Sequence, residues 1–118
     1  GLRGLYEPRL IVDSPVDCER MTRRYHRQWH AGHGRFFAVM RDPAFEQSAR
    51  GRILDVPAHV YRSLAGEARR WIAASLTLNK PDAFRHELHA RFLAGYVRER
   101  IRERIASMRA AHGRRVPA

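Results

Sequence analysis

Apolar side chains recur every three or four positions along two long stretches of the chain, which is the spacing of one face of an α-helix. The first stretch runs from 55 or 56, just before Pro57, to about 78, and the second runs from 81 to about 111. A short polar connection, 79–82, joins them, so we expect an antiparallel helical hairpin. The apolar positions of the second helix are Phe84, Leu88, Phe92, Leu93, Val97, Ile101, Ile105 and Met108.

The residues before 42 predict a third helix that follows an extended segment. The run 5–12 is apolar but is interrupted by Pro8, which favours an edge strand or an irregular segment. Ser14 and Pro15 suit the N-cap and the first turn of a helix that runs to about residue 31. One apolar face of this helix would be formed by Cys18, Met21, Tyr25 and Trp29.

Glycines are expected to shape these helices in two ways. Gly32 and Gly34 are expected to end the first helix, which leaves 35–41 as a short helix or turn and 44–52 as a loop. Gly66 and Gly95 lie inside the two hairpin helices, where each costs about 1 kcal/mol relative to alanine. We therefore expect another helix to approach closely at both positions.

The predicted fold is mainly α-helical. A short N-terminal extended segment, 1–14, precedes a small helical bundle, 15–112, that contains the long antiparallel hairpin, and 113–118 form a disordered basic tail. A single strand has no partner in such a fold, and the chain opens on Gly1 without an initiating methionine. We therefore expect 1–14 to be the edge of a larger domain in a longer protein.

The charge of the chain favours anionic partners. The formal net charge is +11, and Lys80 is the only lysine, so arginine carries nearly all of the positive charge. Such a charge makes nucleic acid, an anionic membrane surface and phosphorylated ligands the partner classes to consider. Arginine suits phosphate because its guanidinium group binds two oxygens at once.

The cysteine content and the hydropathy of the chain limit the cellular compartments in which we expect it. Cys18 is the only cysteine, so the chain has no internal disulfide, and we expect it to be a small buried residue in a reducing environment. No apolar run approaches the roughly 18 residues of a spanning helix, and no signal peptide is evident. We expect a cytoplasmic protein that is either soluble or peripheral on the inner face of the membrane.

The helix over 15–31 carries the candidate binding residues. Its arginines suit phosphate contacts, and its aromatic rings could stack on a ring or an isoprenoid or could simply belong to the core. The candidates for phosphate or acceptor binding are Arg20, Arg24, Arg27, Tyr25 and Trp29. No Ser-His-Asp order, phosphate-binding glycine loop or carboxylate pair is evident, so we assign no catalytic residue.

Histidines offer weak metal candidates. His26, His30 and His33 would share one helical face if the helix continued past Gly32, and three imidazoles can bind zinc. No neighbouring carboxylate or cysteine completes a familiar motif, so no metal or other cofactor is predicted for this chain. His86 and His89 flank a glutamate at the wrong spacing for a metalloprotease helix, and we expect both on the surface.

Several of these residues together resemble the segment that closes the catalytic domain of family 2 glycosyltransferases. The resemblance covers about 6–104, and its motifs are short. It rests on Tyr6, Pro8, the strand Leu10 to Val12, Pro15-Val16, Arg20-x-Thr22, Tyr25 with Trp29, and Gly32 with Gly34. The later residues 56–100 resemble the helical tail of many bacterial members, including a Phe-Leu-x-Gly step at Phe92-Leu93-Ala94-Gly95.

The resemblance implies a role for the parent protein. Such enzymes transfer a sugar from a nucleotide-sugar donor to an acceptor that is often lipid-linked or a polysaccharide. Their catalytic half, with an Asp-x-Asp motif for a divalent metal, precedes this region, and this chain contains no Asp-x-Asp. The chain alone would therefore not catalyse transfer. Ser14 stands where many members have a histidine, which leaves Asp13 as the candidate ligand there.

Two alternatives stay open at this point. The first is a small, basic, all-α nucleic-acid-binding module, although the arginines are spread over every helix and no helix-turn-helix spacing is evident. The second is an interaction domain that forms a homodimer through the long hairpin. An exposed stripe of Phe84, Leu88, Phe92 or Ile101 would favour the dimer.

Overall fold

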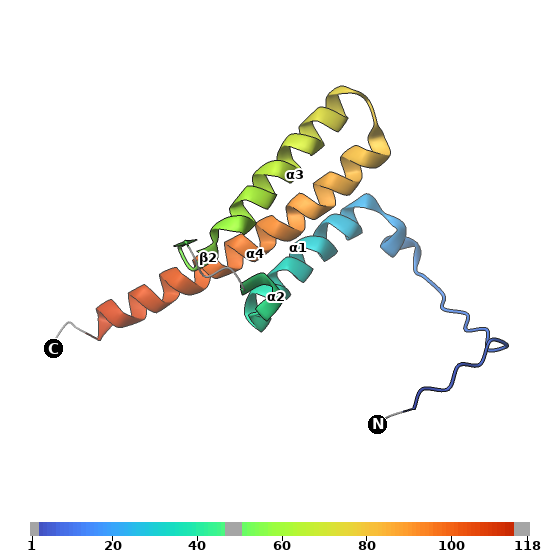
Figure 1. The fold of residues 1–118 in the computed structure, drawn as a ribbon, viewed down its shortest axis with the longest axis horizontal. Coiled ribbons are helices and arrows are strands. Elements are labelled where there is room, and N and C mark those ends of the chain that lie inside the picture. Colours follow the sequence, from blue (N-terminus) through green and yellow to red (C-terminus); the bar gives the residue numbers. More distant parts are fainter. Residues whose placement is uncertain (1–2, 47–50, 115–118) are drawn as a thin grey trace.

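The computed structural model of the chain describes residues 3–46 and 51–114. Its long helices are α1 (Arg23–Met40), α3 (Ala58–Leu76) and α4 (Lys80–Gly113). The shorter elements are η1 (Cys18–Met21), α2 (Pro43–Glu46) and a hairpin of the strands β1 (Arg52–Ile53) and β2 (Val56–Pro57). The mainly helical fold is confirmed (Figure 1).

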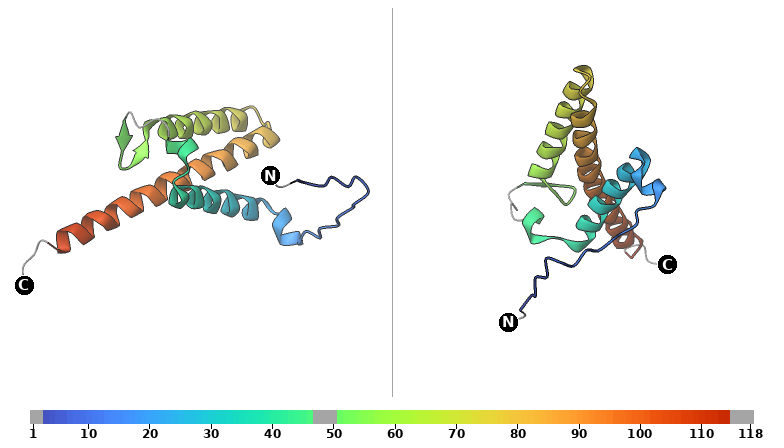
Figure 2. Two further views of the ribbon diagram at one scale, coloured as in Figure 1. Left: turned by 60° about the horizontal axis from the view of Figure 1, so that its bottom comes forward. Right: turned by 90° about the vertical axis from the view of Figure 1, so that its right-hand side faces the viewer.

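Helices α3 and α4 form the predicted antiparallel hairpin, and α1 crosses α4 (Figure 2). A Schellman motif ends α3. In it, the Asn79 N–H donates to the Ala74 carbonyl at 3.0 Å and the Leu78 N–H donates to the Ser75 carbonyl at 3.3 Å. The motif holds Leu78 at φ 58°, a left-handed conformation that glycine usually adopts. Asn79 then caps α4 by accepting from the Asp82 N–H.

The predicted start of the first helix is wrong. Residues 18–21 form only one 3-10 turn, and the Asp17 side chain caps nothing. Helix α1 starts at Arg23, where the Thr22 hydroxyl accepts a hydrogen bond from the Tyr25 N–H at 3.2 Å. Residues 3–21 are exposed, so no packing stabilises an earlier start. Cys18 is exposed for the same reason, not buried as predicted.

The predicted end of that helix is also wrong, because Gly32 and Gly34 lie inside α1. The helix continues to Met40 and ends at Arg41, which has φ 50°. A Cβ at Gly34 would overlap the backbone carbonyl of Phe92, so this glycine permits a close crossing of α1 and α4. No atom of α4 comes within 4 Å of a Cβ built on Gly32.

The two glycines of the hairpin, Gly66 and Gly95, differ in how closely another helix approaches them. A Cβ at Gly95 would overlap the backbone of Ala31, so the expected close approach occurs there. At Gly66 a Cβ would meet nothing within 4 Å, so that expectation is wrong. Gly34 and Gly95 together mark the point where α1 and α4 cross.

The connection between α1 and α3 contains more structure than the loop predicted over 44–52. Helix α2 and strand β1 fall within it, while 47–50 lie outside the described residues. The turn between the strands has positive φ at Leu54 and Asp55, as a two-residue type I′ hairpin requires. Because Pro57 pairs with Arg52 in this hairpin, α3 starts at Ala58, slightly later than predicted.

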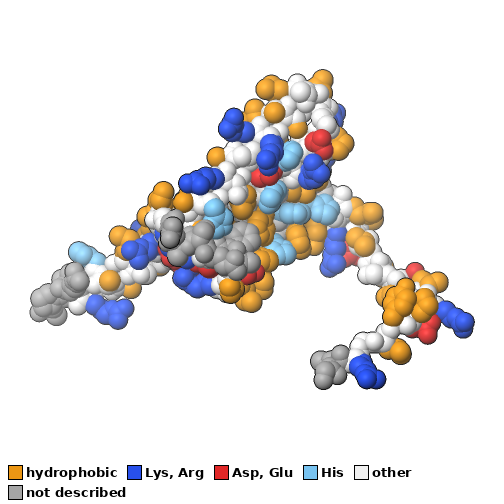
Figure 3. Space-filling view, in the orientation of Figure 1, with side chains coloured by type: hydrophobic (Ala, Val, Ile, Leu, Met, Phe, Trp, Pro, Cys, Tyr) orange, Lys and Arg blue, Asp and Glu red, His pale blue; other side chains and the backbone are white. Residues whose placement is uncertain are grey.

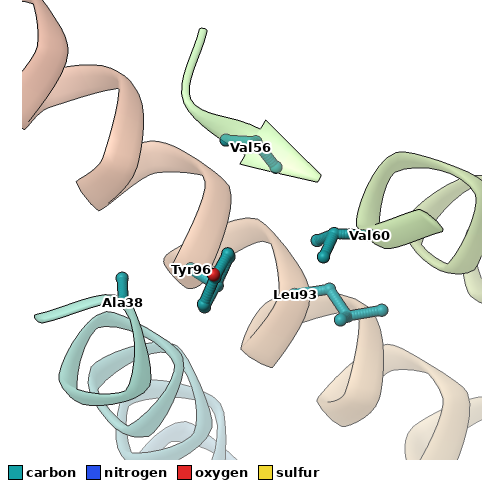
Figure 4. Close-up of a cluster of buried hydrophobic side chains, with 5 residues drawn as sticks. All are labelled: Ala38, Val56, Val60, Leu93 and Tyr96. Atoms are coloured by element: carbon teal, nitrogen blue, oxygen red, sulfur yellow. The ribbon is translucent and has the colours of Figure 1, made fainter. Parts of the chain in front are cut away.

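The core lies where the hairpin of β1 and β2, α1 and α3 meet the middle of α4. Figure 4 shows its five buried side chains, Ala38, Val56, Val60, Leu93 and Tyr96. The apolar faces of the long helices extend beyond it. Ile72 and Leu76 of α3 are exposed, and so are Ile105 and Met108, because α4 continues past its neighbours (Figure 1).

A buried arginine connects the shorter elements to α4. Arg100 is fully buried and pairs with Glu46 of α2 and with Asp55 of the β-turn, the latter at 3.2 Å. Its Nη2 donates to the Tyr96 hydroxyl at 3.3 Å, and that hydroxyl donates to Glu46 at 2.8 Å. Burial raises the pKa of Tyr96, so the hydroxyl keeps its proton for this bond.

The remaining expectations concern the two ends of the chain. Residues 5–12 form no strand, in line with the irregular alternative. Residues 115–118 of the predicted tail lie outside the described residues. In the described part of the chain no helix combines the length and the hydropathy needed to cross a membrane. The division into domains and the cellular compartment stay predictions.

Candidate functional site

Cross-helix ion pairs fix how α1 lies on α4. Arg27 Nε lies 2.6 Å from Glu87 Oε1, and Arg35 Nε lies 3.3 Å from Glu99 Oε2. The order of these pairs shows that α1 runs in the same general direction as α4. Glu87 and Glu99 are both buried, so these carboxylates lie between the helices.

Paired arginines keep these carboxylates charged. Burial by itself would raise the pKa of Glu87, but the hydrogen bonds and charges of Arg27 and Arg91 lower that pKa below its ordinary value. Burial likewise opposes ionisation of Glu99, and Arg102 and Arg35 lower its pKa in the same way. The α1–α4 contact therefore has glycines at its centre and ion pairs at its flanks.

A groove opens where α1 and α3 diverge on the surface of α4. It encloses about 760 Å³, and Figure 3 shows histidine and hydrophobic side chains side by side in this hollow. We call it the aromatic groove. Its lining consists of Trp29, His30 and His33 from α1, Glu67 from α3, and Pro81, Phe84, Arg85, His86, Leu88, His89 and Phe92 from α4.

Ring contacts build one wall of the aromatic groove. The His33 ring stacks on the Phe37 ring with centroids 5.0 Å apart. The Trp29 and His33 rings form a T-shaped pair with centroids 4.6 Å apart. Phe92 completes the cluster at 5.7 Å from His33. Because helix α1 continues through the glycines, His33 lies on the same face as Trp29. Such packed rings form a rigid apolar surface.

A buried carboxylate organises the opposite wall. Glu67 of α3 accepts a hydrogen bond from His86 Nδ1 at 2.7 Å, and His89 Nδ1 lies 3.3 Å from its other oxygen. Burial would raise the pKa of Glu67, but the hydrogen bond from His86, the charge of His89 and the hydrogen bond from Arg70 lower it. The prediction of His86 as a surface residue is therefore wrong, because it is partly buried against Glu67.

The predicted binding residues do not form one site in the structure. Trp29 lines the aromatic groove, and Arg27 beside it is paired with Glu87. Arg24 and Tyr25 line a separate shallow depression that does not include Trp29. Arg20 lies in η1, exposed, 3.9 Å from Asp17. The structure thus brings only Trp29 into the groove.

The metal candidates are also separated. Asp13 lies in the exposed N-terminal segment, away from the histidines of α1. His30 Nδ1 donates to the His26 carbonyl at 2.8 Å, which leaves only Nε2 of this ring available to a metal. Within residues 3–46 and 51–114 no group of three or more potential ligands is arranged to hold a metal ion.

The aromatic groove has the features of a binding site. One wall consists mainly of aromatic rings, the other contains Glu67 with His86 and His89, and Arg85 adds a positive charge. An elongated apolar ligand with an anionic end matches these features. The aromatic residues are visible in the sequence but the groove is not, because its lining comes from α1, α3 and α4, which lie far apart along the chain.

Comparisons of the chain with models of known protein families, with curated proteins and with solved structures find no match.

Proposed function

We propose that this chain is the helical C-terminal region of a family 2 glycosyltransferase, and that its aromatic groove holds the apolar part of a lipid-linked acceptor. The observation that carries the proposal is the bare N-terminal segment, residues 3–17. Leu5 is 96% exposed, Tyr6 86% and Ile11 85%. Figure 1 shows this segment extending away from the helices.

Exposed apolar side chains in a row imply a surface that covers them. The N-terminal segment cannot use the helices for this purpose, because its apolar residues make no buried contact with them. A sheet of a preceding domain would pair its backbone and bury these side chains. The same residues, Tyr6, Pro8 and the run 10–12, carry the resemblance to the end of a glycosyltransferase catalytic domain.

The aromatic groove supports the second part of the proposal. Half-buried rings of Phe84, Phe92 and Trp29 offer the flat apolar contacts that an isoprenoid chain needs. Arg85 is 74% exposed at the side chain and can contact a phosphate. The chemistry of transfer would belong to the preceding half, together with any divalent metal, and Asp13 remains the candidate for a ligand contributed from this chain.

The test uses the full-length protein, obtained by reading the coding sequence upstream of Gly1. Transfer from radiolabelled UDP- and GDP-sugars to undecaprenyl phosphate would be measured for the wild type and for Trp29→Ala. We expect transfer by the wild type and a raised KM for the lipid acceptor in the variant. Phe36→Ala is the control, because Phe36 also contacts His33 but lies outside the groove.

Two results would contradict the proposal. An upstream sequence without a nucleotide-binding half would remove its basis, and unchanged acceptor kinetics in Trp29→Ala would remove the role of the groove. A nucleic-acid-binding function would instead give DNA or RNA affinity with a steep salt dependence. That alternative is less favoured, because many arginines pair with carboxylates, including Arg27, Arg35, Arg91, Arg100 and Arg102.

A dimer through the hairpin has no specific support among the described residues. The stripe that would favour it, Phe84, Leu88, Phe92 and Ile101, is half-buried within the chain. Within α3, α4 and their connection, the more exposed large apolar residues lie at the free end of the hairpin and near the end of α4.

A further inference from the structure

The free end of the α3–α4 hairpin is an exposed apolar surface. Ile72 and Leu76 lie one turn apart on the same face of α3, and Leu78 follows in the connection to α4. Their exposed fractions are 59%, 80% and 82%. We call these three residues the hairpin tip. Figure 3 shows hydrophobic side chains gathered around this end of the molecule.

The backbone at Leu78 is a second, independent observation. Leu78 occupies the left-handed position of the Schellman motif, where glycine or asparagine avoids steric strain. Its side chain packs against little of the chain, so internal packing does not compensate for this strain. Leu78 is more exposed than Leu54, the other leucine at positive φ, at 82% against 49%. A contact outside the molecule would offset the strain at Leu78.

Positive charges surround the hairpin tip. Lys80 and Arg23 line one small depression together with Leu78. Glu87 also lines it, but its charge is compensated by Arg27 and Arg91. Arg85 follows one turn into α4. Asp82 is the only acidic residue between 71 and 86, and Arg85 lies 3.6 Å from its carboxylate. Apolar side chains with cations around them match the boundary between the acyl chains and the headgroups of an anionic bilayer.

We propose that the hairpin tip docks on an anionic lipid bilayer. Leu76 and Leu78 enter the acyl boundary, while Lys80, Arg23 and Arg85 lie at the phosphate headgroups. Docking is peripheral, since no described helix is able to cross the membrane. This inference goes beyond the proposed function and holds whether or not the parent transfers sugar.

The docked orientation has a consequence for the aromatic groove. Pro81, Phe84 and Arg85 line the groove and directly follow the hairpin tip in the chain. One end of the groove therefore opens at the bilayer surface. An apolar chain can then enter it from the membrane without crossing water.

The structure offers a matched pair of variants for the test. Leu54 and Leu78 are both exposed leucines with positive φ, and they lie beyond opposite ends of α3. Asparagine tolerates this backbone, so Leu78→Asn and Leu54→Asn should both fold. The chain is mixed with sedimentable vesicles of phosphatidylglycerol and phosphatidylcholine, or of phosphatidylcholine alone, and the bound fraction is measured.

We expect the wild type to bind the phosphatidylglycerol vesicles and to bind the neutral vesicles far more weakly. Leu78→Asn should lower the partition coefficient about tenfold, the effect of losing one buried leucine. Leu54→Asn should bind like the wild type. Equal losses in the two variants, or wild-type binding by Leu78→Asn, would overturn the proposal.

A second pair tests the helical part of the tip. Leu76→Gln removes an exposed apolar side chain without disturbing α3, and Met108→Gln does the same near the far end of α4. Only Leu76→Gln should weaken vesicle binding. Wild-type binding by Leu76→Gln, or an equal loss in Met108→Gln, would likewise show that the inference is wrong. Absence of wild-type binding to phosphatidylglycerol vesicles leads to the same conclusion.

Discussion

At one end of the α3–α4 hairpin, Val60 and Tyr96 are shielded from solvent, whereas at the other end Leu76 and Leu78 project into it. The closed end is covered by the β1–β2 hairpin, by α2 and by the crossing of α1. The open end has only the short connection between the helices. One pair of helices therefore supplies both the core of the fold and an uncovered surface.

The difference between the two ends indicates which contacts stabilise the fold. Close backbone contact at Gly34 and Gly95, together with the buried Arg100, holds the closed end. The open end makes no comparable contact, so its apolar residues can change with little effect on folding. Substitutions at the two ends should separate accordingly, and the following predictions proceed from the largest effect to the smallest.

The crossing of α1 and α4 should be the most sensitive point. Gly34→Ala places a Cβ against the Phe92 carbonyl, which is backbone and cannot move aside cheaply. We expect a loss of about 4 kcal/mol in unfolding free energy, or failure to fold. Urea unfolding followed by circular dichroism would measure this loss.

The control for this prediction lies in the same helix. Gly32→Ala meets no neighbouring atom, and alanine is the better helix former, so it should stabilise by up to about 1 kcal/mol. If both variants shifted unfolding in the same direction and by the same amount, the close crossing would not be the reason for Gly34.

The buried arginine should come next. Arg100→Met removes the buried partner of Glu46 and Asp55, which keep only the more exposed Arg52 and Arg41, and it removes the donor to Tyr96. We expect a loss of about 3 kcal/mol, the usual result of removing one member of a buried pair. Arg104→Met, one turn further along α4 and exposed, should change stability by less than about 0.5 kcal/mol. Equal effects would contradict the assigned role of Arg100.

These two sites illustrate what the sequence could and could not predict. The helical hairpin followed from the spacing of apolar residues such as Val60 and Leu93, because local periodicity reports local structure. The prediction that Gly34 ends the first helix is wrong, because a glycine that ends a helix and a glycine that lets two helices touch look alike in a sequence. Only the position of Phe92, far along the chain, distinguishes them.

The candidate site was less predictable for a similar reason. The sequence singled out Trp29, which lines the aromatic groove, but also Arg24 and Tyr25, which do not. Glu67 and Glu87 carried no signal at all, because their burial depends on partners from other helices. Charge pairs within one helix are visible in a sequence, whereas pairs between helices require the fold.

Acid should weaken the interfaces that those carboxylates form. The pKa values of Glu67, Glu87 and Glu99 are lowered from the ordinary 4.5 in the folded chain. The stability that they contribute is therefore fully present above about pH 4.5 and is lost as the pH falls through the lowered values. Thermal unfolding between pH 7 and pH 3 should show a falling Tm.

A variant tests the cause of this acid effect. Glu87→Gln keeps the shape of the side chain but cannot ionise, so its Tm should be lower than that of the wild type at pH 7. The difference should shrink as the pH falls below about 4.5, because protons then bind the unfolded wild-type carboxyl and the advantage of the ionised folded form is lost. Asp17→Asn, in the exposed N-terminal segment, is the control and should follow the wild type throughout. A constant difference across the pH range would assign the effect to packing instead of charge.

The smallest changes in unfolding free energy should appear at the two strained leucines, where substitution should stabilise the fold instead of destabilising it. Leu54→Asn at the closed end and Leu78→Asn at the open end each place a residue that tolerates positive φ in a left-handed position. We expect each to stabilise by roughly 0.5–1 kcal/mol in urea unfolding. A loss of stability in Leu78→Asn would show that its side chain contributes to packing, against its exposure.

The double variant Leu54→Asn/Leu78→Asn sharpens the comparison between the ends. The two positions are separated by α3, whose 19 residues span about 28 Å. The changes in unfolding free energy of the two single variants should therefore add within about 0.5 kcal/mol. The double variant should lose no more vesicle affinity than Leu78→Asn alone, because only the open end contacts the bilayer. A chain that becomes more stable while it loses membrane affinity would show that Leu78 is kept at this turn for its contact and not for the fold.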